Sequence, residues 1–122
     1  MDMLFVANTA TCLVAAAHVF AGYKEMTDWP RLAKKLAGID ISHGEATKVV
    51  GWNQGLYNLL FAAGLLIGVF LLDGAEAATL KFFCLGALAV AGLGAFYSMK
   101  SLPLLGMQTG LSGLAMFLLF LS

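Results

Sequence analysis

Residues 46–72 read ATKVVGWNQGLYNLLFAAGLLIGVFLL, a long apolar run in which Lys48 is the only charged residue. A helix needs about 20 mostly apolar residues to cross the hydrocarbon of a bilayer. Three further stretches of this kind lie at 3–26, 78–99 and 102–121. The short alternating strands of a membrane β-barrel are absent. The sequence therefore predicts an all-α fold with four transmembrane helices.

The composition excludes most other classes of protein. Hydrophobic residues make up 61% of the 122 residues and charged residues 11%, whereas soluble domains have about 45–50% and about 25%. A chain this short has a large surface for its volume and needs polar residues to cover it in water. Seven basic residues balance seven acidic ones, which leaves no basic field for nucleic acid. We expect one integral membrane domain over residues 1–122, in contact with the lipid bilayer and without a nucleic-acid partner.

Helix-breaking residues mark the connections between these spans. Pro30 and the run at 38–40 interrupt the first connection, residues 27–45. Asp73 and Gly74 are typical of a tight turn, and Pro103 suits the first turn of the fourth span. Because every connection except the first is short, we expect an antiparallel, up-and-down four-helix bundle.

The basic residues predict the orientation of the bundle. Most of them belong to the first connection, or to the third connection on the same side of the membrane: Lys24, Arg31, Lys34, Lys35, Lys48 and Lys100. Only Lys81 is expected on the other side, with the acidic residues Asp2, Asp73 and Glu76. The positive-inside rule then places both termini outside and residues 27–45 in the cytoplasm.

Residues 29–37 within this connection have two interpretations. Trp29 suits a membrane interface, and Arg31, Lys34 and Lys35 suit anionic head groups. A short amphipathic helix on the membrane surface would use these residues together. The alternative is a solvated basic loop whose charges only direct insertion.

Polar residues occur in the membrane spans at one common depth, in the halves that the orientation places toward the cytoplasm. The candidate ligand-binding residues are His18, Glu25, Asn53, Gln54, Tyr57, Asn58 and Gln108. The outer halves hold few polar residues, such as Asn8 and Thr11. One such residue is explained by an interhelical hydrogen bond worth about 0.6 kcal/mol. Several polar residues at one depth favour a polar cavity open to the cytoplasm. The alternative is a network of hydrogen bonds among these residues that only holds the helices together.

His18 and Glu25 are the candidates for acid–base chemistry. Their separation of seven residues places them on one helix face, about 10 Å apart along the axis. Contact between them would need a bridge such as Asn53, Tyr57 or water. We therefore expect His18 and Glu25 to share a pocket with Asn53 and Tyr57.

The remaining motifs indicate helix packing rather than a catalytic or metal-binding site. Glycine pairs spaced by four residues let helices approach closely: Gly51 and Gly55, Gly64 and Gly68, and Gly106 and Gly110. Cys12 and Cys84 are expected to be inert apolar residues. His18, Glu25 and His43 do not form a metal-ligand set, so no metal site is expected, and the sequence identifies no cofactor.

Several motifs of the chain resemble those of a known protein family. The pattern His18-x6-Glu25-Met26-x2-Trp29-Pro30-Arg31, with the Asn53–Asn58 string NQGLYN and the later AAGL, resembles small bacterial membrane proteins classed as a domain of unknown function (number thirteen-oh-four). The late Gln108 and Gly110 resemble its Gln-Gly element, with Thr109 inserted. The resemblance covers almost the whole chain. It implies a four-helix, multi-pass protein of the bacterial inner membrane and no known reaction.

Three functions remain open from the sequence. The first is a small-molecule or lipid-binding protein, with Glu25 or His18 coupling proton movement to substrate movement in a carrier. Four spans are too few to enclose a transport path, so we expect a homo-oligomer. The second is a membrane enzyme acting on a lipid, isoprenoid or quinone, with His18 or Glu25 as acid or base. The third is a haem- or quinone-binding subunit that uses His18, or else a purely structural or accessory subunit of a larger membrane complex.

Overall fold

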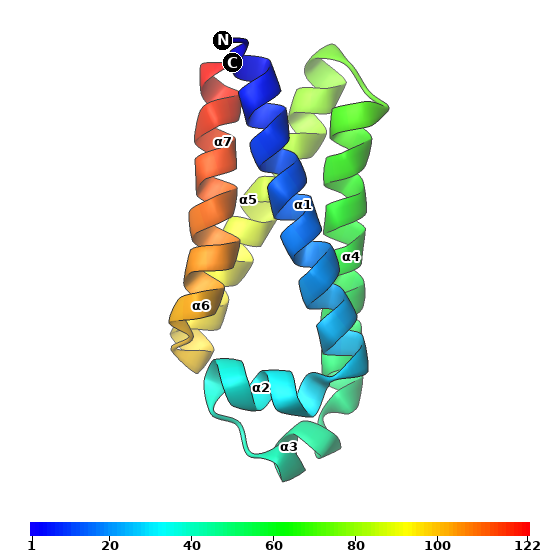
Figure 1. Ribbon diagram of the computed structural model, residues 1–122, viewed down its shortest axis with the longest axis vertical. Coiled ribbons are helices and arrows are strands. Elements are labelled where there is room, and N and C mark those ends of the chain that lie inside the picture. Colours follow the sequence, from blue (N-terminus) through cyan, green and yellow to red (C-terminus); the bar gives the residue numbers. More distant parts are fainter.

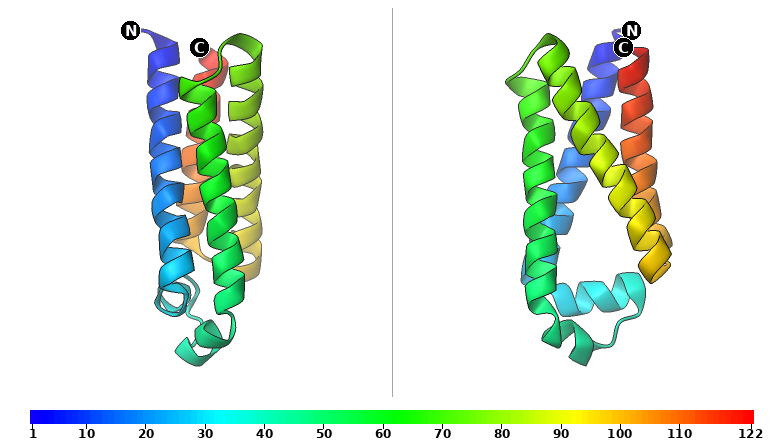
Figure 2. Two further views of the ribbon diagram at one scale, coloured as in Figure 1. Left: turned by 90° about the vertical axis from the view of Figure 1, so that its right-hand side faces the viewer. Right: turned by 180° about the vertical axis from the view of Figure 1, so that it is seen from behind.

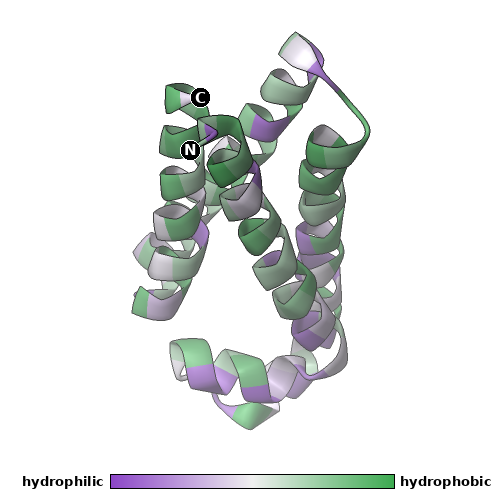
Figure 3. Cartoon of the chain, turned by 45° about the horizontal axis from the view of Figure 1, so that its top comes forward, coloured by the Kyte–Doolittle hydropathy of each residue, from purple (hydrophilic) through white to green (hydrophobic).

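The computed structural model describes residues 1–122 and is entirely helical. The elements are α1 (Met3–Thr27), α2 (Trp29–Ala37), α3 (Ile41–Ala46), α4 (Lys48–Phe70), α5 (Gly74–Met99), α6 (Leu102–Leu104), η1 (Leu105–Gly110) and α7 (Leu111–Leu121). Four helical segments are long and apolar enough to cross a membrane: α1, α4, α5 and the continuous segment Leu102–Leu121. The prediction of an all-α chain with four such helices is confirmed. Figure 3 shows that the spans are mainly hydrophobic.

Both termini lie at one end of the molecule, and α2 and α3 lie at the opposite end (Figure 1). We call these the termini end and the α2 end. Helices α4 and α5 adjoin at the termini end and diverge toward the α2 end, where α2 crosses between them (Figure 2). Helix α1 lies beside α7 at the termini end and crosses to α4 toward the α2 end, and α5 lies beside α6 and η1 (Figures 1 and 2). The bundle is therefore closed at the termini end and splayed at the α2 end.

The contact between α1 and α4 depends on two glycines. A Cβ atom at Gly55 would lie 2.5 Å from the carbonyl oxygen of Gly22 and 2.5 Å from Cγ of Met26. The two backbones approach this closely only because neither position carries a side chain. The buried face of α4 continues from Gly51 and Gly55 through Asn58 and Ala62, which is the spacing of a helix–helix seam.

The apolar core lies nearer the termini end. The fully buried members of its cluster are Ala7, Ala15, Ala62, Leu65, Leu85 and Ala115, and Val14, Cys84, Leu88 and Leu119 complete it. Small and large side chains from α1, α4, α5 and α7 interdigitate here, which gives the close packing expected of a protein interior. Cys12 and Cys84 are both free thiols. This cluster closes the bundle above the splayed region.

The first connection is helical rather than a loop. Helix α2 has the bounds of the amphipathic helix, one of the two interpretations of residues 29–37, and its place at the membrane surface stays a prediction. It begins at Trp29, whose indole Nε1 donates to Oγ1 of Thr47 at 3.0 Å. It ends at Gly38, whose φ of 67° is the left-handed conformation that favours glycine at a helix C-terminus. Helix α3 follows after Asp40, which accepts a hydrogen bond from the Ser42 hydroxyl that lowers the pKa of Asp40.

The start of the fourth span is irregular. Ser101 caps α6, since its hydroxyl accepts from the backbone N–H of Leu104 at 3.4 Å. The six residues of η1 then form a π-helix, a rare conformation that often occurs at functional sites. Thr109 in this turn donates through Oγ1 to the carbonyl oxygen of Ala89 on α5 at 2.7 Å. Gly92 allows this approach, because a Cβ there would lie 2.8 Å from Cβ of Gln108.

Candidate functional site

A hydrogen bond between two membrane spans forms the centre of the site. Nδ2 of Asn58 on α4 donates to Oε1 of Glu25 on α1 at 2.7 Å. Glu25 is 6% exposed and Asn58 is 4% exposed. The second carboxyl oxygen, Oε2, is buried and has no hydrogen-bond partner within the chain. A buried carboxyl oxygen without a hydrogen-bond partner is costly, so Glu25 is the residue here that most requires a functional explanation.

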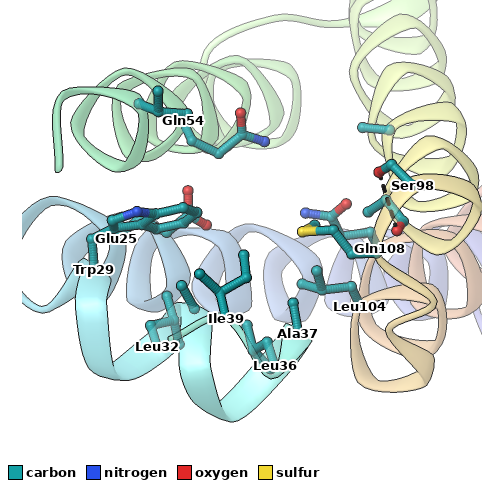
Figure 4. Close-up of a pocket in the computed structure, with 15 residues that line it drawn as sticks. Glu25, Trp29, Leu32, Leu36, Ala37, Ile39, Gln54, Ser98, Leu104 and Gln108 are labelled. Atoms are coloured by element: carbon teal, nitrogen blue, oxygen red, sulfur yellow. Dashed lines mark hydrogen bonds between the residues drawn. The ribbon is translucent and has the colours of Figure 1, made fainter. Parts of the chain in front are cut away.

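Glu25 lines a cavity of about 330 Å³ between the diverging helix pairs, which we call the α4–α5 cavity. Figure 4 shows Glu25 and Trp29 at one end of it and Ser98, Leu104 and Gln108 at the other. Its remaining walls come from α2, the connection after it, α4 and α5: Leu32, Ala33, Leu36, Ala37, Ile39, Val50, Gln54, Ala91, Ala95 and Met99. The splay of the bundle, with α2 as the floor, therefore creates the cavity.

A second cavity of about 320 Å³ lies between α1, α2 and the start of the fourth span, and we call it the α1–α6 cavity. It shares four lining residues with the first cavity: Glu25, Leu32, Leu36 and Leu104. Its polar lining includes Lys24, Arg31 and Lys35. Glu25 thus lines two cavities, each of a size found in small-molecule sites.

The α4–α5 cavity is less polar than the sequence suggested. Eleven of its 15 lining residues are hydrophobic, so it offers an apolar surface with a few polar points. Gln54 lies at the side of the cavity and Gln108 at the end opposite Glu25, and Figure 4 draws no hydrogen bond from either amide to another lining residue. These amides can therefore bind polar groups of a ligand. This combination suits an amphipathic molecule.

His18 lies on the same buried face of α1 as Glu25 but outside both cavities. Its side chain is fully buried, and Nδ1 is 2.8 Å from the carbonyl oxygen of Val14. Because that oxygen can only accept, Nδ1 carries the proton and Nε2 is an acceptor. Nε2 has no hydrogen-bond partner, and neither does the buried hydroxyl of Ser112 on α7.

Asn53 and Tyr57 do not join this group. Both are on the exposed face of α4, and Tyr57 is 59% exposed. The expectation that they share a pocket with His18 and Glu25 is therefore not met. The physical reason is that the seam of α4 follows its small residues, Gly51 and Gly55. These bring α4 against α1 and turn Asn53 and Tyr57 outward.

Two residues of interest were missed from the sequence. Trp29 was assigned to the membrane interface, yet it lines the α4–α5 cavity and anchors α2 on Thr47. Lys81 was counted as a flanking charge, yet it is 3% exposed and its Nζ donates to Oδ1 of Asn8 at 2.8 Å. The available signal for Lys81 was its position two turns inside an apolar helix, where a lysine calls for a reason.

Comparison with known proteins gives a family and no activity. A family model described as "Protein of unknown function (DUF1304)" matches residues 12–120. This range includes all seven candidate residues and every helix except the first turns of α1. No curated protein matches the chain, and no solved structure matches it.

Proposed function

Because the chain belongs to the DUF1304 family, whose function is unknown, we propose a function from the site itself. The protein binds an amphipathic small molecule between its splayed helix pairs, in the membrane and near its cytoplasmic face. The polar head donates a hydrogen bond to Glu25, and the apolar body lies along the walls of the two cavities. The observation that carries this proposal is Glu25, whose Oε2 is buried without a hydrogen-bond partner and which lines both cavities.

The class of ligand follows from the surfaces it would contact. A head group with an N–H or O–H donor would satisfy Oε2 of Glu25, whereas a carboxylate head would repel an ionised Glu25. The apolar lining, which includes Ala91, Ala95 and Leu104, favours a hydrocarbon body. Lipids, isoprenoids and other long-chain alcohols or amines have this arrangement. By the positive-inside rule, the basic residues between positions 24 and 35 favour the cytoplasmic face of a bacterial inner membrane for this end.

The alternative functions make different demands on the same residues. A proton-coupled carrier needs a second opening toward the termini end, and the packed cluster of Leu65, Leu85 and Leu88 lies there. An enzyme using His18 and Glu25 together needs both at the ligand, but His18 lies outside the cavities. A haem bound through His18 needs space for its macrocycle beside Nε2, but that atom is fully buried inside the bundle. These considerations favour ligand binding over the alternatives.

Trp29 provides a direct test of the proposal. The chain has two tryptophans, so Trp52→Phe leaves Trp29 as the only one, and Trp29 lines the α4–α5 cavity. In detergent, bromine-labelled dodecanol or dodecylamine should quench Trp29 fluorescence in a saturable manner. The matching dodecanoate, which lacks a donor when ionised, should quench it only weakly. Equal saturable quenching by all three would show that the head group is not recognised and would contradict the proposal.

A matched pair of acid variants completes the test. Glu25→Ala removes the acceptor and should weaken binding of the dodecylamine probe about tenfold or more. Glu76→Ala removes an exposed carboxylate at the termini end and should leave binding unchanged. If both variants bind the probe as the parent does, Glu25 is not the recognition group. Proton-coupled flux of the probe in liposomes, lost in Glu25→Gln, would instead support a carrier.

A further inference from the structure

The termini end of the bundle contains a second buried polar group, separate from the Glu25 site. Lys81 on α5 is 3% exposed, and its Nζ donates to Oδ1 of Asn8 on α1 at 2.8 Å. Helix α5 begins at Gly74, so Lys81 lies about two turns inside the helix. Gly68 on α4 makes room for it, because a Cβ there would lie 2.8 Å from Cγ of Lys81. Three helices thus form the lysine's environment.

Lys81 lacks a counter-charge within the protein. The three ion pairs of the chain involve Lys24, Arg31 and Lys48, and no carboxylate oxygen lies within 4.0 Å of Nζ of Lys81. The neutral amide of Asn8 engages one of the three N–H donors of an ammonium group. Buried lysines in membrane spans are ordinarily paired. The lysine therefore has binding capacity that the chain does not use.

A cavity adjoins this group. It has a volume of about 350 Å³, and Asn8 and Lys81 both line it together with apolar residues such as Leu4, Phe82 and Leu119. Asp73 is the acidic side chain in the lining, at the first residue before α5. The lining thus holds one cation, one carboxylate, one amide and the hydroxyl residue Ser122 among apolar walls, and Lys81 is its one basic side chain.

We propose that this cavity binds an anionic group, a phosphate or a carboxylate, on the ammonium group of Lys81. Asn8 is a positioning residue, since its Oδ1 holds Nζ in place and leaves the other two N–H donors for the ligand. The apolar walls would contact the chains of an anionic lipid, whereas a free anion would use the polar atoms alone. This site does not depend on the proposed function at Glu25.

Thermal unfolding in a neutral detergent tests the site and identifies the source of the anion. Dioleoyl phosphatidylglycerol should raise the Tm of the protein, and dioleoylglycerol, which lacks the phosphate, should not. Sodium phosphate is compared with sodium chloride at equal ionic strength. A rise with the phospholipid alone identifies a lipid ligand, and a rise with both identifies an anion site open to solution. No rise with either, or an equal rise with dioleoylglycerol, would overturn the proposal.

Three variants locate the effect. Lys81→Met keeps the apolar stem and should lower the apparent affinity for phosphatidylglycerol about tenfold or more. Lys100→Met removes an exposed lysine at the α2 end and should leave it unchanged. Asn8→Asp places a carboxylate at the position that Nζ already contacts, so it should displace the lipid while the protein stays folded. Retained phosphatidylglycerol binding in both Lys81→Met and Asn8→Asp would exclude Lys81 as the anion site.

Discussion

Asn58 and Glu25 are 33 positions apart in sequence, yet Nδ2 of Asn58 donates to Oε1 of Glu25 at 2.7 Å and joins α4 to α1 inside the bundle. The same carboxyl group keeps Oε2 without a partner beside two cavities. One side chain therefore serves two purposes: one oxygen holds two helices together, and the other is available to a ligand.

The coupling between these two residues can be measured in a double-mutant cycle. We expect the pair of substitutions Glu25→Leu and Asn58→Leu to show an interaction free energy of about 0.6–1.7 kcal/mol, the range found for hydrogen bonds between membrane helices. Asn58→Leu alone should destabilise the protein more than the double variant does, because it leaves the whole carboxyl group buried without a donor. The measurement is the free energy of unfolding in detergent. Additive single effects would contradict a structural bond.

Gly55→Ala should destabilise the protein by about 1–3 kcal/mol, since its Cβ would collide with the Gly22 carbonyl oxygen and with Met26. Gly86→Ala is the matched control, because nothing lies within 4 Å of a Cβ at that position of α5. The control should be neutral or stabilising by up to about 1 kcal/mol, as is usual when alanine replaces a glycine within a helix. Equal Tm values for the two variants would disprove the close contact of α1 and α4.

His18→Leu should change the free energy of unfolding by less than about 1 kcal/mol. Nε2 of His18 is already buried without a partner, and replacing an unsatisfied polar group by an apolar one of similar size is nearly neutral. Thermal unfolding of His18→Leu beside Leu88→Ala, a fully packed core control, would measure this. A loss of about 2 kcal/mol or more in His18→Leu would mean that Nε2 has a partner, such as a buried water.

The proposed orientation predicts which positions a reagent can reach from outside the cell. In a variant without Cys12 and Cys84, Glu76→Cys at the termini end should react with a membrane-impermeant maleimide on intact cells. Lys35→Cys on α2 should react only after the membrane is permeabilised, because the basic residues retain their end in the cytoplasm. Both side chains are exposed in the structure. Labelling of Lys35→Cys on intact cells would reverse the assigned orientation.

Much of the fold could be predicted from the sequence because it depends on length and composition. The four apolar helices and the amphipathic helix Trp29–Ala37 follow from hydropathy and from the placement of basic residues. Helix α3 was not predicted, because Ile41–Ala46 is too short for a periodic pattern. The π-helical turn was not predicted either, since no composition distinguishes it from an α-helical turn.

The site was only partly predictable, for a physical reason. A membrane span is apolar all round, so its hydrophobic pattern does not identify the face that is buried. Asn53 and Asn58 looked equivalent by type and depth, yet one is exposed and the other bonds to Glu25. The spacing of the small residues does identify the buried face of α4. Gly51 and Gly55 lie on this face, and Asn58 follows them on the same face. The burial of Lys81 depends on Gly68 of another helix, which no local pattern reveals.

The π-helical turn η1 has a consequence for the length of the fourth span. A π-helical turn takes up one extra residue locally, so the helix on either side keeps the faces it would have without that residue. Thr109 lies in this turn, and its hydroxyl donates to the carbonyl oxygen of Ala89 on α5. We therefore expect a variant that lacks Thr109 to form an ordinary α-helical turn here, with Gln108 still at the cavity and Ala115 still in the core.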